Sequence, residues 1–252
     1  MKKLMAANWK MYKTEKEAAQ TAKELLEQVG NLPDDREVLL IPTFTSLSAV
    51  APILEGKSGW SLGGQNFYPD EEGAFTGEIS PGMLKDVGCT YALAGHSERR
   101  HVMGEDDAFV ARKVGFGLEK GLKMILCIGE KIEQRKAGDV EKVLSMQLEA
   151  GLNGLPKNVS SEDLSVAYEP VWAIGTGEVA GEEEITDAHG FVREMLRKIF
   201  PEKGDSIRIL YGGSVKPDNC ETIISLDNVD GVLVGGASLK ADSFSRIVLA
   251  GI

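Results

Sequence analysis

The feature that most limits the fold of this chain is an alternation of short apolar runs with amphipathic stretches, repeated eight times between residues 4 and 250. Each apolar run has the length of a strand, and most of the stretches that follow space their apolar residues as a helix does. The predicted strands cover residues 4–9, 37–41, 60–65, 90–94, 124–128, 164–168, 207–211 and 231–234. The predicted helices cover residues 15–29, 46–54, 106–120, 131–152, 183–200, 217–225 and 243–250, and a third begins after Ser80 with Pro81 in its first position.

Most of these strands are apolar on both faces, as expected for parallel strands that helices cover. Eight strand–helix units without a linker or a shift of composition predict a single (β/α)8 barrel domain of the α/β class over residues 1–252. An open doubly wound sheet usually carries a Gly-x-Gly-x-x-Gly turn after its first strand. Here the first strand ends in Asn8, Trp9 and Lys10, which favours the barrel.

Composition narrows the range of partners. The chain has 28 Lys and Arg against 39 Asp and Glu, a net charge of -11, which argues against nucleic acid or an anionic membrane as the main partner. No apolar run approaches the roughly 18 residues of a membrane helix, and the basic N-terminus lacks the apolar core of a signal peptide. We therefore expect a cytoplasmic protein. Cys89, Cys127 and Cys220 lack metal-site or disulfide spacing, so buried thiols are expected.

In a (β/α)8 barrel the functional site lies at the carboxyl ends of the strands, so the polar residues that close each strand are the candidates. These residues are Asn8, Lys10, His96, Cys127, Glu130, Glu169 and the segments 212–214 and 235–236. Gly-Gly pairs follow the seventh and eighth strands, where backbone N–H groups can approach an oxyanion, usually phosphate. One such pair could be an ordinary turn, but two after adjacent strands predict a phosphorylated ligand.

Glu169 ends the sixth strand and begins a loop that is stiff at its start and flexible at its end. Pro170 restricts Glu169 to extended conformations, and Gly175 and Gly177 give the far end its freedom. A surface loop that merely exposes a glutamate would rarely carry the Val, Trp and Ile side chains of residues 171–174. The loop is therefore predicted to be a lid over a carboxylate.

His96 precedes a predicted helical turn, and a helix N-terminus disfavours the imidazolium ion. We expect His96 to be neutral and able to donate a hydrogen bond, the alternative being a structurally satisfied histidine at a strand end. His101 and His189 are predicted to be surface residues. A carboxylate base, a neutral histidine and a lysine predict proton transfer next to a carbonyl, with Glu169 as the base.

Eight segments, in this order, resemble the triosephosphate isomerase family along nearly the whole chain. They are residues 7–11, 64–66, 73–80, 95–100, 127–130, 167–177, 211–215 and 230–239. The resemblance implies a TIM barrel that interconverts dihydroxyacetone phosphate and D-glyceraldehyde 3-phosphate through an enediol(ate). It also implies a reaction without cofactor or metal, in glycolysis and gluconeogenesis.

The resemblance further implies a role for each candidate residue. Glu169 would be the base, His96 the neutral electrophile, and Lys10 the cation near the developing oxyanion and the phosphate. The other implied residues are Asn8 as a further donor, Glu98 and Cys127 in support, and Gly175, Ser214, Gly235 and Gly236 around the phosphate.

Residues 66–76 form a long loop that carries Phe67, Tyr68 and Phe75, and we expect these rings to pack against something other than their own barrel. The resemblance implies that the loop enters a second subunit near its active site, with Thr76 at the contact. A two-fold homodimer is then the simplest closed assembly.

The sequence departs from the family pattern at two places, residues 93–94 before the His96 segment and Glu178 after the lid, where the family often has lysine. Two rival functions would fit part of this pattern. Other phosphate-binding barrels, acting on sugar phosphates or on histidine or tryptophan precursors, would share the glycine pairs without requiring Asn8, His96 and Glu169 together. An inactive barrel kept for binding or adhesion would be expected to have lost Lys10, His96 or Glu169, and all three are present.

Overall fold

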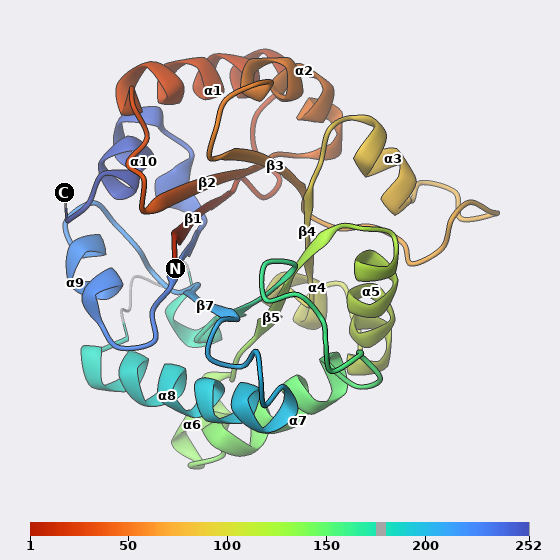
Figure 1. Ribbon diagram of the computed structural model, residues 1–252, viewed down its shortest axis with the longest axis vertical. Helices are drawn as coiled ribbons and strands as arrows, with labels where there is room; N and C mark the ends of the chain where they lie inside the picture. Colours follow the sequence, from red (N-terminus) through yellow and green to blue (C-terminus); the bar gives the residue numbers. More distant parts are fainter. Residues whose placement is uncertain (175–179, 252) are drawn as a thin grey trace.

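The computed structural model describes residues 1–174 and 180–251. Within them, parallel strands in the order β1 to β8 close into a barrel, and the helices surround it (Figure 1). The strands are β1 (Lys3–Asn8), β2 (Arg36–Ile41), β3 (Trp60–Gly64), β4 (Tyr91–Ala94), β5 (Lys123–Ile128), β6 (Leu164–Tyr168), β7 (Arg208–Tyr211) and β8 (Gly231–Val234). The barrel closes where β1 pairs with both β2 and β8, with Met5 opposite Val38 and Val232. This confirms the predicted fold class.

The helices and short 3-10 turns fill the connections between strands. They are α1 (Glu15–Val29), α2 (Phe44–Leu54), α3 (Pro81–Asp86), α4 (Ser97–His101), α5 (Asp107–Glu119), α6 (Ile132–Lys136), α7 (Val140–Gly151), η1 (Val171–Ala173), α8 (Glu182–Ile199), α9 (Cys220–Ser225), η2 (Gly236–Ser238) and α10 (Ala241–Val248). Helix α1 begins and ends where the sequence predicts, because Thr14 and Glu17 form a capping box and Gly30 follows the last turn.

The apolar core has two parts because successive residues of a strand point to opposite faces. Leu4 and Ala6 of β1 belong to a cluster inside the barrel with side chains from β2, β4, β5, β6, β7 and β8. Met5 and Ala7 belong to a larger cluster between the strands and the surrounding helices. Burial on both faces explains why the strands read as continuous apolar runs in the sequence.

Two predicted helices differ from the structure. The helix predicted over residues 131–152 is two helices, α6 and α7, because Gly138 adopts a φ of +76° between them, which an α-helix cannot contain. The helix predicted over residues 217–225 begins only at Cys220. The Asn219 side chain accepts from the N–H of Lys216 at 2.7 Å and donates to the carbonyl of Ser214, so a turn replaces the first helical residues.

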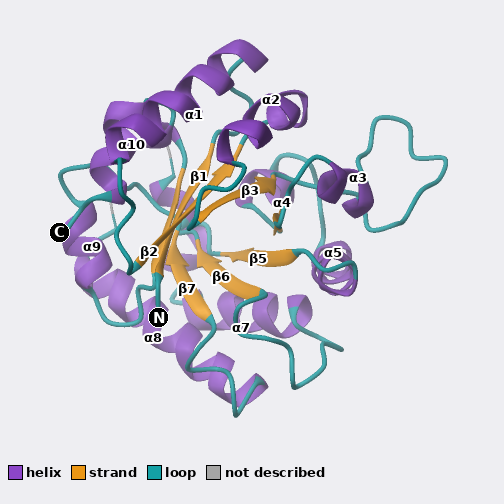
Figure 2. Cartoon of the chain, turned by 45° about the horizontal axis from the view of Figure 1, so that its top comes forward, coloured by secondary structure: helices purple, strands orange, loops and turns teal. Residues whose placement is uncertain are grey.

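Burial also corrects two predictions. His189 on α8 is fully buried rather than at the surface, whereas His101 is exposed as predicted. The loop of residues 66–76 packs in part on its own barrel, since Phe67 is fully buried in the core. Beyond it Tyr68 stacks on Phe75 with ring centroids 4.0 Å apart. The tip of the loop projects beyond α3, away from the barrel (Figure 2).

Other sequence expectations have mixed outcomes. Cys89, Cys127 and Cys220 are free and buried, as predicted. In the described part of the chain, no helix is long and apolar enough to cross a membrane. The expectation of one domain over residues 1–252 stays a prediction.

Candidate active site

Lys10 lies just beyond the carboxyl end of β1 in a backbone conformation that its neighbours fix. Its φ is +50°, a region that costs free energy for a residue with a side chain. The Asn8 side-chain oxygen accepts from the N–H of Lys10 at 3.0 Å, and the Gln65 amide donates to its carbonyl at 2.7 Å. The Nζ atom of Lys10 then lies 2.7 Å from Oε1 of Glu98. Hydrogen bonds thus hold the backbone of Lys10, and the ion pair with Glu98 holds its ammonium group.

His96 caps the short helix α4 and is buried. Its Nδ1 accepts the N–H of Glu98 at 3.2 Å, so this nitrogen carries no hydrogen. The ring is therefore the neutral tautomer with its hydrogen on Nε2. That atom lies 3.1 Å from Oε1 of Glu169. A ring in this tautomer can donate a hydrogen bond through Nε2.

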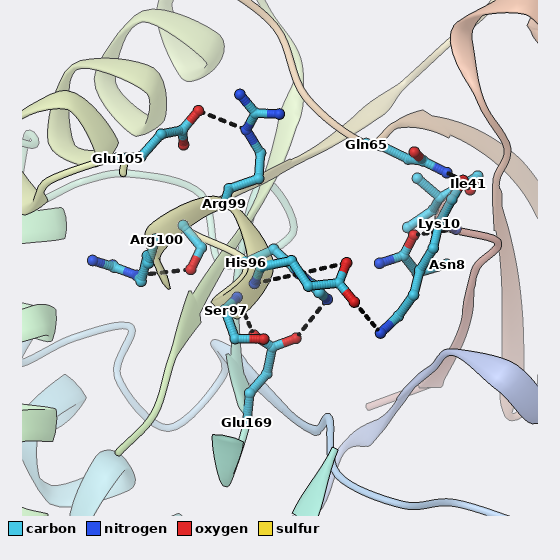
Figure 3. A network of polar contacts seen from close by, with 12 residues as sticks. Asn8, Lys10, Ile41, Gln65, His96, Ser97, Arg99, Arg100, Glu105 and Glu169 are labelled. Carbon is cyan, nitrogen blue, oxygen red and sulfur yellow. Dashed lines mark hydrogen bonds and ion pairs between the residues drawn. The ribbon is translucent and has the colours of Figure 1, made fainter. Parts of the chain in front are cut away.

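Glu169 follows β6 and points its carboxylate at the first turn of α4. Its Oε2 accepts the N–H of Ser97 at 2.9 Å, and its Oε1 faces His96 (Figure 3). Only 2% of the side chain is exposed. The carboxylate is thus held by the protein with little access to water.

The side chains of Asn8, Lys10, His96 and Glu169 share one cavity of about 290 Å³. The other lining residues are Leu233 of β8 and residues of the loops after β6, β7 and β8, which are Ile174, Gly212, Gly213, Ser214, Val215, Lys216, Gly235, Gly236 and Ala237. The glycine pairs lie next to the charged groups, since a side chain at Gly212 would begin 2.8 Å from Cγ of Glu169. A side chain at Gly235 would begin 3.0 Å from Cε of Lys10, so glycine keeps this wall open.

The loop after Glu169 is anchored at its start by Glu130, a fully buried carboxylate. Glu130 accepts from Nε1 of Trp172 at 2.8 Å, from the hydroxyl of Tyr168 at 3.2 Å and from Arg135 at 3.1 Å. Burial, together with the charge of Glu130, raises the pKa of the Tyr168 hydroxyl, which therefore stays a donor. Gly175, Gly177 and Glu178, which the sequence assigned to the lid and the phosphate site, lie outside the described residues.

Two further candidates lie away from the cavity in the described part of the chain. Cys127 is fully buried, and both its burial and the charge of Glu169 raise the pKa of its thiol well above the usual range. It fills space beside the base as a neutral group. Thr76 is exposed in the projecting loop and does not line the cavity.

The sequence reading did not find three contacts of this site. Ser97 contributes a backbone N–H, which no side-chain pattern reveals. Gln65 holds the carbonyl of Lys10, and its position directly after β3 was the available signal. Lys216 is a second cation that lines the cavity. Among the described residues, no three His, Cys, Asp or Glu side chains are grouped as metal ligands.

The polar groups gather at the carboxyl end of the strands, where (β/α)8-barrel enzymes hold their substrates. Fold and site together therefore put the chain in the class of (β/α)8-barrel enzymes.

Comparisons with known proteins name the family. The model of the family described as triosephosphate isomerase matches residues 3–251. The triosephosphate isomerase of Oleidesulfovibrio alaskensis is 63% identical over 250 residues, covering 99% of this chain and 100% of that protein. The enzyme of Nitratidesulfovibrio vulgaris, strain Miyazaki F, is 61% identical, with 99% and 100% covered. A crystal structure of triosephosphate isomerase from Bartonella henselae superposes with a TM-score of 0.88 at 38% identity and covers 98% of both chains. The chain belongs to the triosephosphate isomerase family.

Proposed function

We propose that this protein interconverts dihydroxyacetone phosphate and D-glyceraldehyde 3-phosphate in glycolysis and gluconeogenesis. The assignment of this reaction rests on membership of the triosephosphate isomerase family. The observation that carries the mechanism is the contact between the neutral His96 and the buried Glu169, 3.1 Å apart in a cavity that Lys10 also lines.

The substrate phosphate would lie against the loops after β7 and β8. Gly213, Ser214, Gly235 and Gly236 line that side of the cavity, and backbone N–H groups of such loops hold oxyanions. Gly175 is a further proposed phosphate residue from the sequence alone. Lys10 and Lys216 attract a dianion locally despite the net charge of -11.

The proton transfer would follow from the orientation of three side chains. Glu169 removes a proton from the hydroxyl-bearing carbon next to the carbonyl, which leaves an enediolate. After the hydroxyl proton has moved to the former carbonyl oxygen, Glu169 returns its proton to the former carbonyl carbon, so that the other oxygen becomes the carbonyl. Negative charge develops on the carbonyl oxygen, where Nε2–H of His96 and the ammonium of Lys10 stabilise it. Asn8 holds Lys10 through the 3.0 Å contact and is placed to donate to substrate oxygens as well. Glu98 fixes the position of the Lys10 ammonium.

We also propose a homodimer formed through residues 66–76. The projecting loop tip supports this, as do the exposed apolar side chains of Met11, Tyr12, Val102 and Met103 on other connections at the carboxyl end of the barrel. In a two-fold dimer each loop would cover apolar surface of the other subunit and bring Thr76 toward that subunit's site.

A coupled assay of the purified protein with each triose phosphate tests the proposed reaction. Turnover in both directions is expected. A protein that binds phosphorylated sugars without interconverting the two trioses would instead favour a different barrel enzyme. A folded protein with neither property would favour the inactive binding module.

A further inference from the structure

A buried glutamine on helix α7 contacts the backbone beside the catalytic base. Gln147 is 6% exposed. Its Oε1 accepts the N–H of Gly129 at 2.7 Å, and its Nε2 donates to the carbonyl of the same residue at 3.2 Å. One side chain thus satisfies both polar groups of a single backbone residue, as a neighbouring strand would do.

Gly129 needs this support because the barrel ladder ends just before it. The paired residues of β5 and β6 end with Ile128 and Tyr168. Beyond them the N–H of Glu169 donates to the carbonyl of Ile128 at 2.7 Å and the N–H of Val171 to the carbonyl of Glu130 at 3.1 Å, on either side of Gly129. A buried peptide group without a partner costs free energy, and the amide of Gln147 takes the place of the missing ladder partner.

The position of Gly129 in turn limits the position of Glu169. A side chain at residue 129 would begin 1.7 Å from the carbonyl oxygen of Glu169, so the two backbones lie in direct contact. The next residue, Glu130, accepts from Trp172, and its carbonyl accepts the N–H of Val171 at 3.1 Å. A shift of the Gly129 backbone would therefore move both the base and the start of the loop that follows it.

We infer that Gln147 is a positioning residue for the proton transfer. It holds Gly129, and Gly129 sets the backbone from which Glu169 reaches His96. The inference rests on the proposed function. It adds a residue on helix α7 to a site that otherwise consists of residues at the ends of strands. Because Gln147 touches neither the cavity nor the phosphate side, it affects the chemical step and not substrate affinity.

Gln147→Met tests the inference at a similar side-chain volume, because it removes both hydrogen bonds to Gly129. A displacement of the base by a fraction of an ångström to 1 Å should lower kcat on the order of 10- to 100-fold, with KM nearly unchanged. The matched control is Leu148→Ala on the same helix, which loses core packing but none of these hydrogen bonds. It should lower the melting temperature and keep the kcat of the wild type.

Gln147→Glu should change the pH dependence of kcat, which a general loss of stability would not do. A protonated carboxyl accepts from the N–H of Gly129 and donates to its carbonyl, whereas a carboxylate only accepts. The nearby acidic groups, Glu130 and Glu169, favour its protonated form. The ratio of variant to wild-type kcat should therefore be close to one at low pH and fall as pH rises. This variant decides the question if Gln147→Met does not fold.

Wild-type turnover is measured first, since its absence would contradict the proposed function by itself. A crystal structure of Gln147→Met, or of Gln147→Glu at high pH, then tests the inference without an activity reading. The expected result is a displaced Gly129 backbone and a Glu169 carboxylate out of hydrogen-bond distance of His96. An unmoved Glu169, a wild-type kcat in Gln147→Met, or a pH-independent ratio in Gln147→Glu would overturn it.

Discussion

Nε2 of His96 and Oε1 of Glu169 lie 3.1 Å apart, so the proposed electrophile and the proposed base contact each other directly. The other carboxylate oxygen accepts from Ser97 at 2.9 Å. For Glu169 to take a proton from carbon, a substrate must come between the two side chains and replace at least one of these contacts. Small changes in the reach of Glu169 should therefore affect the chemical step strongly.

Shortening this carboxylate tests its reach. Glu169→Asp keeps the charge but withdraws the carboxylate by one methylene, so we expect kcat to fall on the order of 100-fold while KM changes little. Steady-state kinetics in both directions measure this. Glu162→Asp, at an exposed position on the same connection to β6, is the control and should keep wild-type kinetics. A Glu169→Asp enzyme with wild-type kcat would rule out Glu169 as the base.

Removing the cation tests the electrostatic role of Lys10. Lys10→Met keeps a flexible stem of similar length and leaves Glu98, whose side chain is 48% exposed, free to be solvated. We expect an unchanged circular dichroism spectrum and a loss of kcat/KM of several orders of magnitude, because the developing oxyanion loses its charged partner. Lys16→Met, on the exposed surface of α1, should be fully active. If Lys10→Met retains a tenth of wild-type kcat/KM, the role proposed for Lys10 is wrong.

Buried His189 should make the folded state sensitive to acid. Burial, reinforced by the charge of Arg193 and opposed by the bond to the carbonyl of Asn228, lowers its pKa to about 4. Its ordinary value, about 6.5, applies in the unfolded chain. Between these two values the unfolded chain binds a proton that the folded protein does not. The contribution of His189 to the free energy of unfolding is therefore fully present above pH 6.5. It falls as pH drops toward 4, by about 3 kcal/mol in total.

Urea unfolding of the wild type and of His189→Gln between pH 4.5 and 7.5 measures this contribution. Carboxylates titrate in both proteins, so the difference between the two curves isolates the histidine. The variant should be less stable at pH 7 but lose less stability as pH falls. Parallel curves for the two proteins would show that His189 does not carry the effect.

A charge in the projecting loop tests the proposed assembly. Thr76→Arg should give a folded monomer with strongly reduced kcat, because a guanidinium cannot be buried against a partner without a countercharge. Analytical ultracentrifugation and activity are measured on the same sample. Ser58→Arg, exposed on the connection that leads into β3, should leave assembly and activity unchanged. A fully active Thr76→Arg monomer would show that each barrel is self-sufficient.

Most strands and helices of this protein could be predicted from the sequence, because they depend on interactions between residues close together in the chain. The strands and helices follow from apolar periodicity and from signals such as the Thr14 cap and Pro81, all of which act within a few residues. The strand-end candidates followed from one rule of barrel topology, that strands present their carboxyl ends at one face. Asn8, Lys10, His96 and Glu169 do meet there in one cavity. Glu98, Gly175 and Thr76 followed only from the family resemblance.

Tertiary structure decided what depends on contacts between distant segments. His189 and Phe67 occur in patterns that fit a surface as well as a core, and only the packing of α8 and of the loop after β3 buries them. Each of the contacts made by Ser97, Gln65 and Gln147 involves a backbone N–H or carbonyl group. The types of these three residues therefore did not predict the contacts. A sequence records which groups a chain carries, but the free energy of a buried hydrogen bond depends on where the barrel brings its two partners together.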